Sequence, residues 1–491
     1  MNKIRNLAIT ILAASLFIGC SENERTIEYP TVDIYSTGTL DISKIDITDS
    51  STVIHFSAMY IPKYWIKLDK NSYIQAGGVK LPATGSGKLI LGEKFYMPEN
   101  GRDTFYVTFP PIPKGTKSID FMEAKEGDAF RLYGIDLTGK SKHRPFKGIP
   151  KKLLELPDRN AGLPKVRLNA EKSIVNMHFI GYRPEIGHSV ELYVKSLLSG
   201  QKHPEMQIDT ITGTASLECL LCGPAEMSSA RPEYLDFIVS PGETVDIYMD
   251  LYAASDRVRK KHFPEISSDI KDRPSVYFDG YYSTLNYFLN NESRDELPFP
   301  PFLDMGEVDY RWSDAEFADR LLSNYRNLCD SITSLPVAES VKEFYINGMK
   351  SSALFATVIS DKLRLSSYRS ECGHDSEVPE FNVLDSVSRN SIAAVINVND
   401  SSLAVCTDNE CYLGILLGPK EFSGKFFKDE SPLARQTGKV ISIVSGKVNE
   451  GSLSEKDLAA VDSLGNNFLS ESYHAMYEDM IERRKATISI K

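Results

Sequence analysis

The spacing of apolar residues changes near residue 255, and this change constrains the fold more than any other feature of the sequence. Before it, apolar side chains alternate with polar ones, as at Phe105, Val107 and Phe109. Short alternating runs bounded by turn-rich segments such as GGVKLPATGSG are typical of antiparallel β-sandwiches. After it, apolar residues recur every three or four positions, which is typical of amphipathic helices. The sequence therefore predicts a multidomain chain with a β half followed by a helical half.

The β half divides at a basic, proline- and glycine-rich segment, TGKSKHRPFKGIPKK (138–152), which carries six Lys/Arg side chains and no acid. This composition indicates a solvated linker, with a lipid-head or glycan contact as the alternative. A second set of alternating runs follows, for example Val245, Ile247 and Met249 after SPGE. A chain of 491 residues also exceeds what one hydrophobic core serves. We expect two tandem antiparallel β-sandwich domains and then a mainly helical domain.

In the helical half, Ser313 and Glu316 form a capping box ahead of Phe317, Leu321 and Tyr325. The final segment, NNFLSESYHAMYEDMIERRKATISIK, has the pattern of a long amphipathic helix. The expected divisions of the chain are a signal peptide (1–19), a lipidated tether (20–31), β-sandwich domain 1 (32–140), a basic linker (141–163), β-sandwich domain 2 (164–252) and a helical domain (253–491).

The N-terminus, MNKIRNLAITILAASLFIGC, has a short basic start and an apolar run too brief to span a bilayer, as in secretory signal peptides. Gly19 directly before Cys20 resembles the cleavage site of a bacterial lipoprotein. That resemblance implies a lipid on Cys20 and anchoring in the outer membrane, facing the periplasm or the cell surface. The alternative is an ordinary secreted protein in which Cys20 is incidental.

The charge balance argues against nucleic acid as a partner. Removing residues 1–19 takes away two of the 56 basic side chains and none of the 67 acidic ones, which leaves a net charge of −13. An acidic surface repels phosphate backbones. The expected partners are the membrane, through the lipid, and other molecules of the cell envelope.

Several segments resemble the N-terminal region of TlpA-like thiol–disulfide oxidoreductases anchored as lipoproteins in Gram-negative envelopes. These segments are WIKLDKNSYIQAGGVKL (65–81), FPPIPKGTKSIDFMEA (109–124), FRLYGIDL (130–137), GYRPEIG (181–187), SPGETVDIYMD (240–250), FDGYYSTLNYFLN (278–290) and the final SESYHAMYEDMIERRKATI. The resemblance implies two β-domains and a helical region that serve as accessory parts of a redox enzyme. It also implies a thioredoxin-type envelope protein as a partner.

The catalytic part of that family is not evident in this sequence. In the family, a C-terminal thioredoxin domain bears a Trp-Cys-x-x-Cys turn. Here the chain ends at Lys491, and neither Trp65 nor Trp312 precedes a cysteine pair. We therefore expect an accessory region without its catalytic domain.

Cys219 and Cys222, in ECLLCG, are the alternative redox pair. Reactive CxxC pairs place the first cysteine at a helix N-terminus, which lowers its pKa. Leu217, Cys219 and Leu221 instead alternate as strand residues. Cysteines three positions apart in a strand are about 10 Å apart, beyond the roughly 7 Å that a disulfide allows. We expect Cys219 to be a core thiol and Cys222 a strand-end residue, and a zinc site would need a second ligand pair.

The other cysteines give weaker signals. Cys406 and Cys411 flank TDNE, a loop long enough for a structural disulfide in an oxidising envelope. Cys372, with His374 and Asp375, has the donor types of a metal site, but an exposed loop is the expected structure. We expect no metal and no cofactor.

Three functions follow from these observations. The favoured one is a non-catalytic envelope lipoprotein that binds or scaffolds a partner, because no phosphate loop, HExxH or GxSxG motif occurs in the chain. The second is a thiol–disulfide redox protein that uses Cys219 and Cys222 or a thioredoxin domain supplied in trans. The third is a surface glycan- or nutrient-binding lipoprotein. Exposed aromatic side chains grouped on one loop surface would favour the third function over the first.

Overall fold

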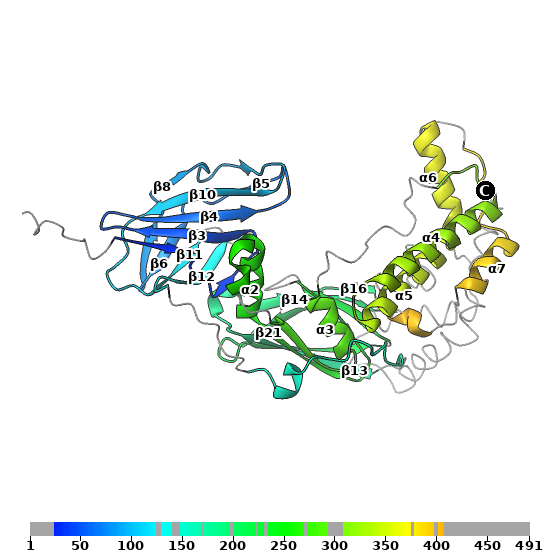
Figure 1. Ribbon diagram of the computed structural model, residues 1–491. Helices are drawn as coiled ribbons and strands as arrows, with labels where there is room; N and C mark the ends of the chain where they lie inside the picture. The colour runs from blue at the N-terminus through cyan, green and yellow to red at the C-terminus, as the bar shows by residue number, and fades with distance from the viewer. Residues whose placement is uncertain are drawn as a thin grey trace, which may run out of the picture. The chain divides into compact units, whose positions relative to one another are not determined.

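The computed structural model describes residues 24–406 except 124–128, 140–147, 168–170, 197–199, 222, 230–233, 270–272, 293–307, 375–377 and 397–400. The described chain comprises many antiparallel strands followed by helices, which confirms the expected β-then-α arrangement (Figure 1). It forms two compact units. The first contains the described parts of residues 1–147 and 250–275, and the second those of 148–249 and 276–491.

The first unit is a β-sandwich of two five-stranded sheets, which we call sheet I (β1-β3-β4-β10-β8) and sheet II (β2-β12-β11-β6-β7). A short ribbon of β5 and β9 accompanies them. The strands are β1 Arg25–Glu28, β2 Ile34–Tyr35, β3 Leu40–Ile47, β4 Thr52–Met59, β5 Trp65–Ile66, β6 Tyr73–Ala76, β7 Val79–Pro82, β8 Gly85–Gly87, β9 Phe95–Tyr96, β10 Arg102–Phe109, β11 Ser118–Met122 and β12 Arg131–Asp136.

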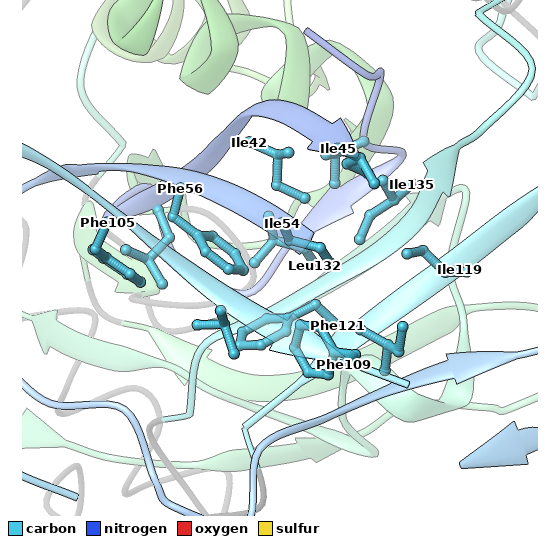
Figure 2. Close-up of a cluster of buried hydrophobic side chains, with 14 of the residues drawn as sticks. Ile42, Ile45, Ile54, Phe56, Phe105, Phe109, Ile119, Phe121, Leu132 and Ile135 are labelled. Atoms are coloured by element: carbon cyan, nitrogen blue, oxygen red, sulfur yellow. The ribbon is translucent and has the colours of Figure 1, made fainter. Parts of the chain in front are cut away.

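The core of this sandwich follows from the alternation in the sequence. Every second side chain of β4 is buried, from Thr52 to Ala58, because successive side chains of a strand point to opposite faces. Phe56 of β4 packs against Phe105 in the same sheet, with ring centroids 5.3 Å apart, and against Phe121 of sheet II at 4.9 Å (Figure 2). Removing such a ring costs about 3–5 kcal/mol of stability.

Strand β1 lies within the segment that the polar composition assigns to the tether. Its register pairs Arg25 with Ile47 and Ile27 with Ile45 of β3. Ile27 is the one buried side chain of the strand. A single apolar residue in a polar run gives too weak a pattern to be recognised as a strand from sequence.

Helix α2 (Leu251–His262) lies between two strands of the second sandwich in sequence but packs on β2, β3 and β4 of the first unit. The Asp250 side chain caps it by accepting from the backbone N–H groups of Tyr252 and Ala253. At its other end, the His262 ring contacts the Ser57 hydroxyl (Nδ1 to Oγ 3.1 Å) and the Gly38 carbonyl (Nε2 to O 2.9 Å). Segment 250–275 thereby folds with the first sandwich, across the boundary that the sequence places at 252/253.

The second unit contains a second β-sandwich. Its main sheets are sheet III (β18-β13-β21-β22) and sheet IV (β16-β15-β19-β20), with a β14–β17 pair beside them. The strands are β13 Glu171–Ile180, β14 Ser189–Glu191, β15 Tyr193–Ser196, β16 Gly200–Lys202, β17 Glu205–Gln207, β18 Thr214–Leu221, β19 Ala225–Ser229, β20 Leu235–Val239, β21 Thr244–Asp250 and β22 Val276–Asp279.

Helix α3 (Ser283–Asn291) covers one edge of each sheet in this unit. The Asn286 side chain accepts from the Ile238 N–H (2.8 Å) and donates to the Ile238 carbonyl (2.9 Å) in edge strand β20. Asn291 donates to the Val276 carbonyl of edge strand β22 at 2.8 Å. Side-chain amides thus replace the missing neighbouring strand.

The described residues of the second unit after α3 are mainly helical, with α4 Asp314–Ser334, α5 Glu339–Val358, α6 Ser360–Cys372 and α7 Ser386–Val395. The capping box of Ser313 and Glu316 forms as the sequence predicts, and Phe317, Leu321 and Tyr325 are buried. Helix α4 packs against α5 and α7 (Figure 1). The expected C-terminal helix lies outside the described residues.

Candidate functional site

Five apolar side chains form a surface at one end of the first sandwich, which we call the aromatic patch: Tyr60, Ile61, Tyr64, Trp65 and Tyr96. Tyr60 is 38% exposed, Ile61 59%, Tyr64 51% and Tyr96 62%. The ring centroids of Tyr60 and Tyr64 are 6.0 Å apart. Those of Tyr64 and Trp65 are also 6.0 Å apart, with only 15° between the ring planes. Tyr96 lies directly opposite Trp65 in the β5–β9 ribbon. Ring contacts therefore link Tyr60, Tyr64 and Trp65, and Tyr96 pairs with Trp65 across the ribbon.

Two loops present the patch, and backbone hydrogen bonds join them. The Tyr60 N–H donates to the Gly101 carbonyl (2.9 Å), and the Met97 N–H donates to the Tyr64 carbonyl (2.7 Å). Ile66 and Met97, next to exposed members of the patch, are each only 3% exposed and anchor the ribbon in the core. The rings therefore stand on a fixed backbone, which lowers the entropy cost of binding a ligand to them.

Gly101 is required for this arrangement. Its φ is +66°, in the left-handed region that favours glycine. A Cβ atom at this position would lie 2.4 Å from the carbonyl oxygen of Tyr60. No other residue type fits between the two loops without moving one of them.

Lys63 lies between Ile61 and Tyr64 in the sequence and has a backbone φ of +63°. Left-handed backbone costs a non-glycine residue roughly 1–2 kcal/mol, and such residues cluster at functional sites. The Lys63 ammonium forms an ion pair with the Glu99 carboxylate (3.0 Å) on the exposed rim of the patch. An exposed pair of this kind contributes little stability, so the backbone strain is not offset by the ion pair.

Lys94 contributes a positive charge to the patch. Its Nζ lies 4.3 Å from the centre of the Trp65 ring. The negative face of the indole attracts the ammonium, an effect worth about 0.5–1 kcal/mol at an exposed site. Lys94 directly precedes β9, and Tyr96 in β9 is the register partner of Trp65. The patch therefore combines flat apolar rings with charged groups at their edges.

The patch lies at the end of the sandwich away from the point where the chain enters it. Arg25, the first residue of β1, pairs with Ile47, and Ile47 in turn pairs with Thr52. Strand β4 runs from Thr52 to Met59 and leads directly into Tyr60. Eight residues of strand span about 23 Å. Arg25 and Tyr60, where the patch begins, are therefore separated by about the length of the strands.

Polar groups on the outward faces of the sheets form a different kind of cluster. His55 contacts the Asp46 carboxylate at 2.9 Å, and His178 contacts that of Asp246 at the same distance. Asp246 also accepts from Asn176, and Asp46 accepts from Lys44 and Thr26. These contacts join neighbouring strands, so both pairs belong to cross-strand polar ladders that stabilise the sheets.

The structure places one cysteine of the alternative redox pair, Cys219 and Cys222. Cys219 lies in β18 opposite Ser173 of β13. It is partly exposed, whereas the sequence predicts a core position, because β18 is an edge strand of sheet III. Cys222 lies outside the described residues, as does Cys20.

Of the other cysteines and their neighbours named in the sequence, some lie in the described structure and some lie outside it. Cys406 is buried near the end of the described chain, and its predicted partner Cys411 lies outside the described residues. Cys372 is exposed at the end of α6, with its sulfur 4.0 Å from the Tyr310 hydroxyl. His374 is exposed beside it, and Asp375 lies outside the described residues.

Among the described residues, no group of three or more His, Cys, Asp and Glu side chains is arranged to hold a metal ion. None of the described helices is both long and apolar enough to cross a bilayer.

The sequence did not single out the patch. Trp65 opens one of the family-like segments and precedes no cysteine pair, and YIPKYW falls between two alternating runs. The available signal was a set of large apolar residues around Pro62, in a segment where a turn normally carries small or polar residues. Apolar residues in a turn have no core to enter and are left on the surface.

Comparisons with known proteins identify no family. No protein-family model matches the chain, and no curated protein matches it. Among solved structures, the Bacillus anthracis TIE protein is similar at 10% identity and a TM-score of 0.13 over 50% of this chain and 44% of that one. A GH20 exo-β-N-acetylglucosaminidase from Vibrio harveyi in complex with N-acetylglucosamine is similar at 11% identity and a TM-score of 0.12, over 38% and 39%. This chain spans less than half of each, and scores this low carry no argument.

Proposed function

We propose that this protein is a non-catalytic lipoprotein of the outer membrane that acts as a binding module, with the aromatic patch as its binding surface. The N-terminal sequence supports the anchor, because Gly19-Cys20 resembles a lipoprotein cleavage site. The resemblance of the chain to the accessory region of TlpA-like oxidoreductases supports a role without chemistry of its own.

The observation that carries the proposal is that the large side chains of the patch are exposed to solvent on a hydrogen-bonded backbone. If each large side chain has about 200 Å² of surface, the exposed fractions of Tyr60, Ile61, Tyr64 and Tyr96 together correspond to about 400 Å² of accessible surface. The largest apolar patch on a typical monomer is about 300–600 Å² and is often functional. Exposed rings on a fixed backbone, beside a strained lysine, are the arrangement expected of a binding surface.

Two measurements test the proposal. Expression of the full chain and of Cys20→Ser, followed by fractionation, should find the wild-type protein in membranes and the variant in the soluble fraction. The mature Cys20→Ser chain should then sediment with isolated envelopes of the native cells, and a Tyr64→Ala/Tyr96→Ala variant should not. Equal sedimentation of the two chains would refute the aromatic patch as the binding surface.

A further inference from the structure

We infer that the aromatic patch binds the pyranose rings of a carbohydrate. This inference rests on the proposed function and names the ligand class of the same surface. A pyranose ring exposes C–H groups on one face and carries hydroxyl groups around its edge. The polarised C–H groups pack on the negative faces of aromatic rings, as cations do. Tyr60, Tyr64 and Tyr96 carry aromatic rings and are 38%, 51% and 62% exposed.

The polar rim of the patch matches the hydroxyl edge of a sugar. Lys63 and Glu99 supply a donor and an acceptor on one side, and Lys94 supplies a donor next to Trp65. Among the described residues, none forms a hydrogen bond with the phenol oxygen of Tyr60, Tyr64 or Tyr96. A hydroxyl group donates and accepts, so these three phenols are available to sugar hydroxyls. Ligand sites combine apolar surface with a few placed polar groups in this way.

The size of the patch favours a small ligand over a protein. A standard protein interface buries about 800 Å² on each partner, roughly twice the exposed area of the patch. Two or three sugar rings, each lying flat on an aromatic side chain, match the extent of Tyr60, Tyr64 and Tyr96. The patch rings are already oriented by neighbouring contacts, as between Tyr64 and Trp65, so a weakly binding sugar need not order them.

The position of the patch disfavours a lipid surface as the ligand. Tyrosine, tryptophan and lysine are also the residues of membrane interfaces. Here the patch begins at Tyr60, at the end of β4 away from the β1 entry point at Arg25. Cys20 is five positions before Arg25, so the two lie at most about 18 Å apart when the chain is fully extended, less than the length of the strands. A lipid on Cys20 would therefore hold the opposite end of the sandwich near the membrane.

The test is affinity electrophoresis of the mature Cys20→Ser chain in gels that contain soluble β-glucan, xylan, mannan or polygalacturonate. We expect at least one polysaccharide to retard the protein. Tyr64→Ala and Tyr96→Ala should each weaken binding about tenfold, the effect of losing one ring contact. Tyr234→Ala is the matched control, because Tyr234 is 57% exposed and lies in the second unit. It should leave binding unchanged.

Tryptophan fluorescence can detect contact between the polysaccharide and the aromatic patch. The chain has two tryptophans, so a Trp312→Phe variant leaves Trp65 as the reporter. Binding of the retarding polysaccharide should shift the Trp65 emission, and Tyr64→Ala should reduce that shift. Retardation that persists in Tyr64→Ala/Tyr96→Ala, or the absence of retardation by all four polysaccharides, would overturn the inference.

The two proposals fail in different ways. Envelope sedimentation that depends on the patch, without binding to any polysaccharide, refutes the carbohydrate and leaves the binding module intact. In that case, patch-dependent binding to vesicles of phosphatidylethanolamine and phosphatidylglycerol would show a lipid ligand instead. Sedimentation that does not depend on Tyr64 and Tyr96 refutes the binding module itself.

Discussion

Replacing Gly101 by alanine should destabilise the first unit by about 3 kcal/mol. Left-handed backbone costs alanine roughly 1–2 kcal/mol. The new Cβ would also lie 2.4 Å from the Tyr60 carbonyl oxygen, so one loop must shift, and overpacking of this kind costs about 1–3 kcal/mol. Gly115 provides a matched control. Its φ is +79°, and a Cβ there would meet nothing within 4 Å.

The control isolates the close approach of the two loops. Gly115→Ala carries only the backbone term, so we expect it to destabilise the unit by about 1 kcal/mol. Thermal unfolding followed by Trp65 emission in a Trp312→Phe background reports on the first unit. At about 3 °C per kcal/mol for a unit of this size, thermal midpoints should fall by about 9 °C for Gly101→Ala and about 3 °C for Gly115→Ala. Equal losses in the two variants would refute the contact between position 101 and Tyr60.

Other predictions concern the two helices that bind sheet surfaces and the thiol in β18. Burial raises the pKa of the Asp41 carboxyl to about 6, so its contribution to stability falls as pH rises from about 4 to 6. Burial lowers the pKa of His262 to about 4, so its contribution is present above pH 6.5 and is lost as pH falls toward 4. The two effects oppose each other in the wild type. In urea titrations, stability between pH 4 and 6.5 should therefore rise with pH in Asp41→Asn and fall with pH in His262→Asn, and parallel curves would contradict both assignments. Asn286→Ala leaves the buried N–H and C=O of Ile238 unpaired and should destabilise the second unit by about 2–4 kcal/mol in thermal unfolding, whereas a loss under 1 kcal/mol would contradict the edge contact. The mature chain should not reduce insulin, and turnover that disappears in Cys219→Ser would establish a redox enzyme instead.

Periodicity was sufficient to predict a β half followed by a helical half, but not strand β22 (Val276–Asp279), which lies within the predicted helical half. The alternation at Phe105, Val107 and Phe109 and the capping box at Ser313 each depend on neighbours in the sequence, and each forms as predicted. The docking of α2 on the first sandwich was not predicted, because it depends on partners more than 150 residues away. His262, for example, contacts Ser57 and Gly38. No pattern among neighbouring residues in the sequence indicates these contacts.

The candidate site was beyond sequence analysis for a related reason. Whether Tyr64 and Tyr96 are buried or exposed depends on how two loops meet, and their separation in sequence hides the fact that they share a surface. For Cys219, the secondary structure was predictable but the exposure was not. Its strand was predictable from the alternation, but its partial exposure depends on β18 having no neighbour on one side within sheet III.

The docking of α2 has a consequence for how the protein is made. The first sandwich is completed by residues 250–275, which leave the ribosome only after the whole intervening stretch from 148 to 249 has been synthesised. Until then Asp41 lacks the positive charge of Arg259, and Gly38 and Ser57 lack the His262 ring. A fragment that stops between the two sandwiches would remain in this unfinished state. Shortened versions intended to retain the N-terminal sandwich should therefore include the 250–275 segment.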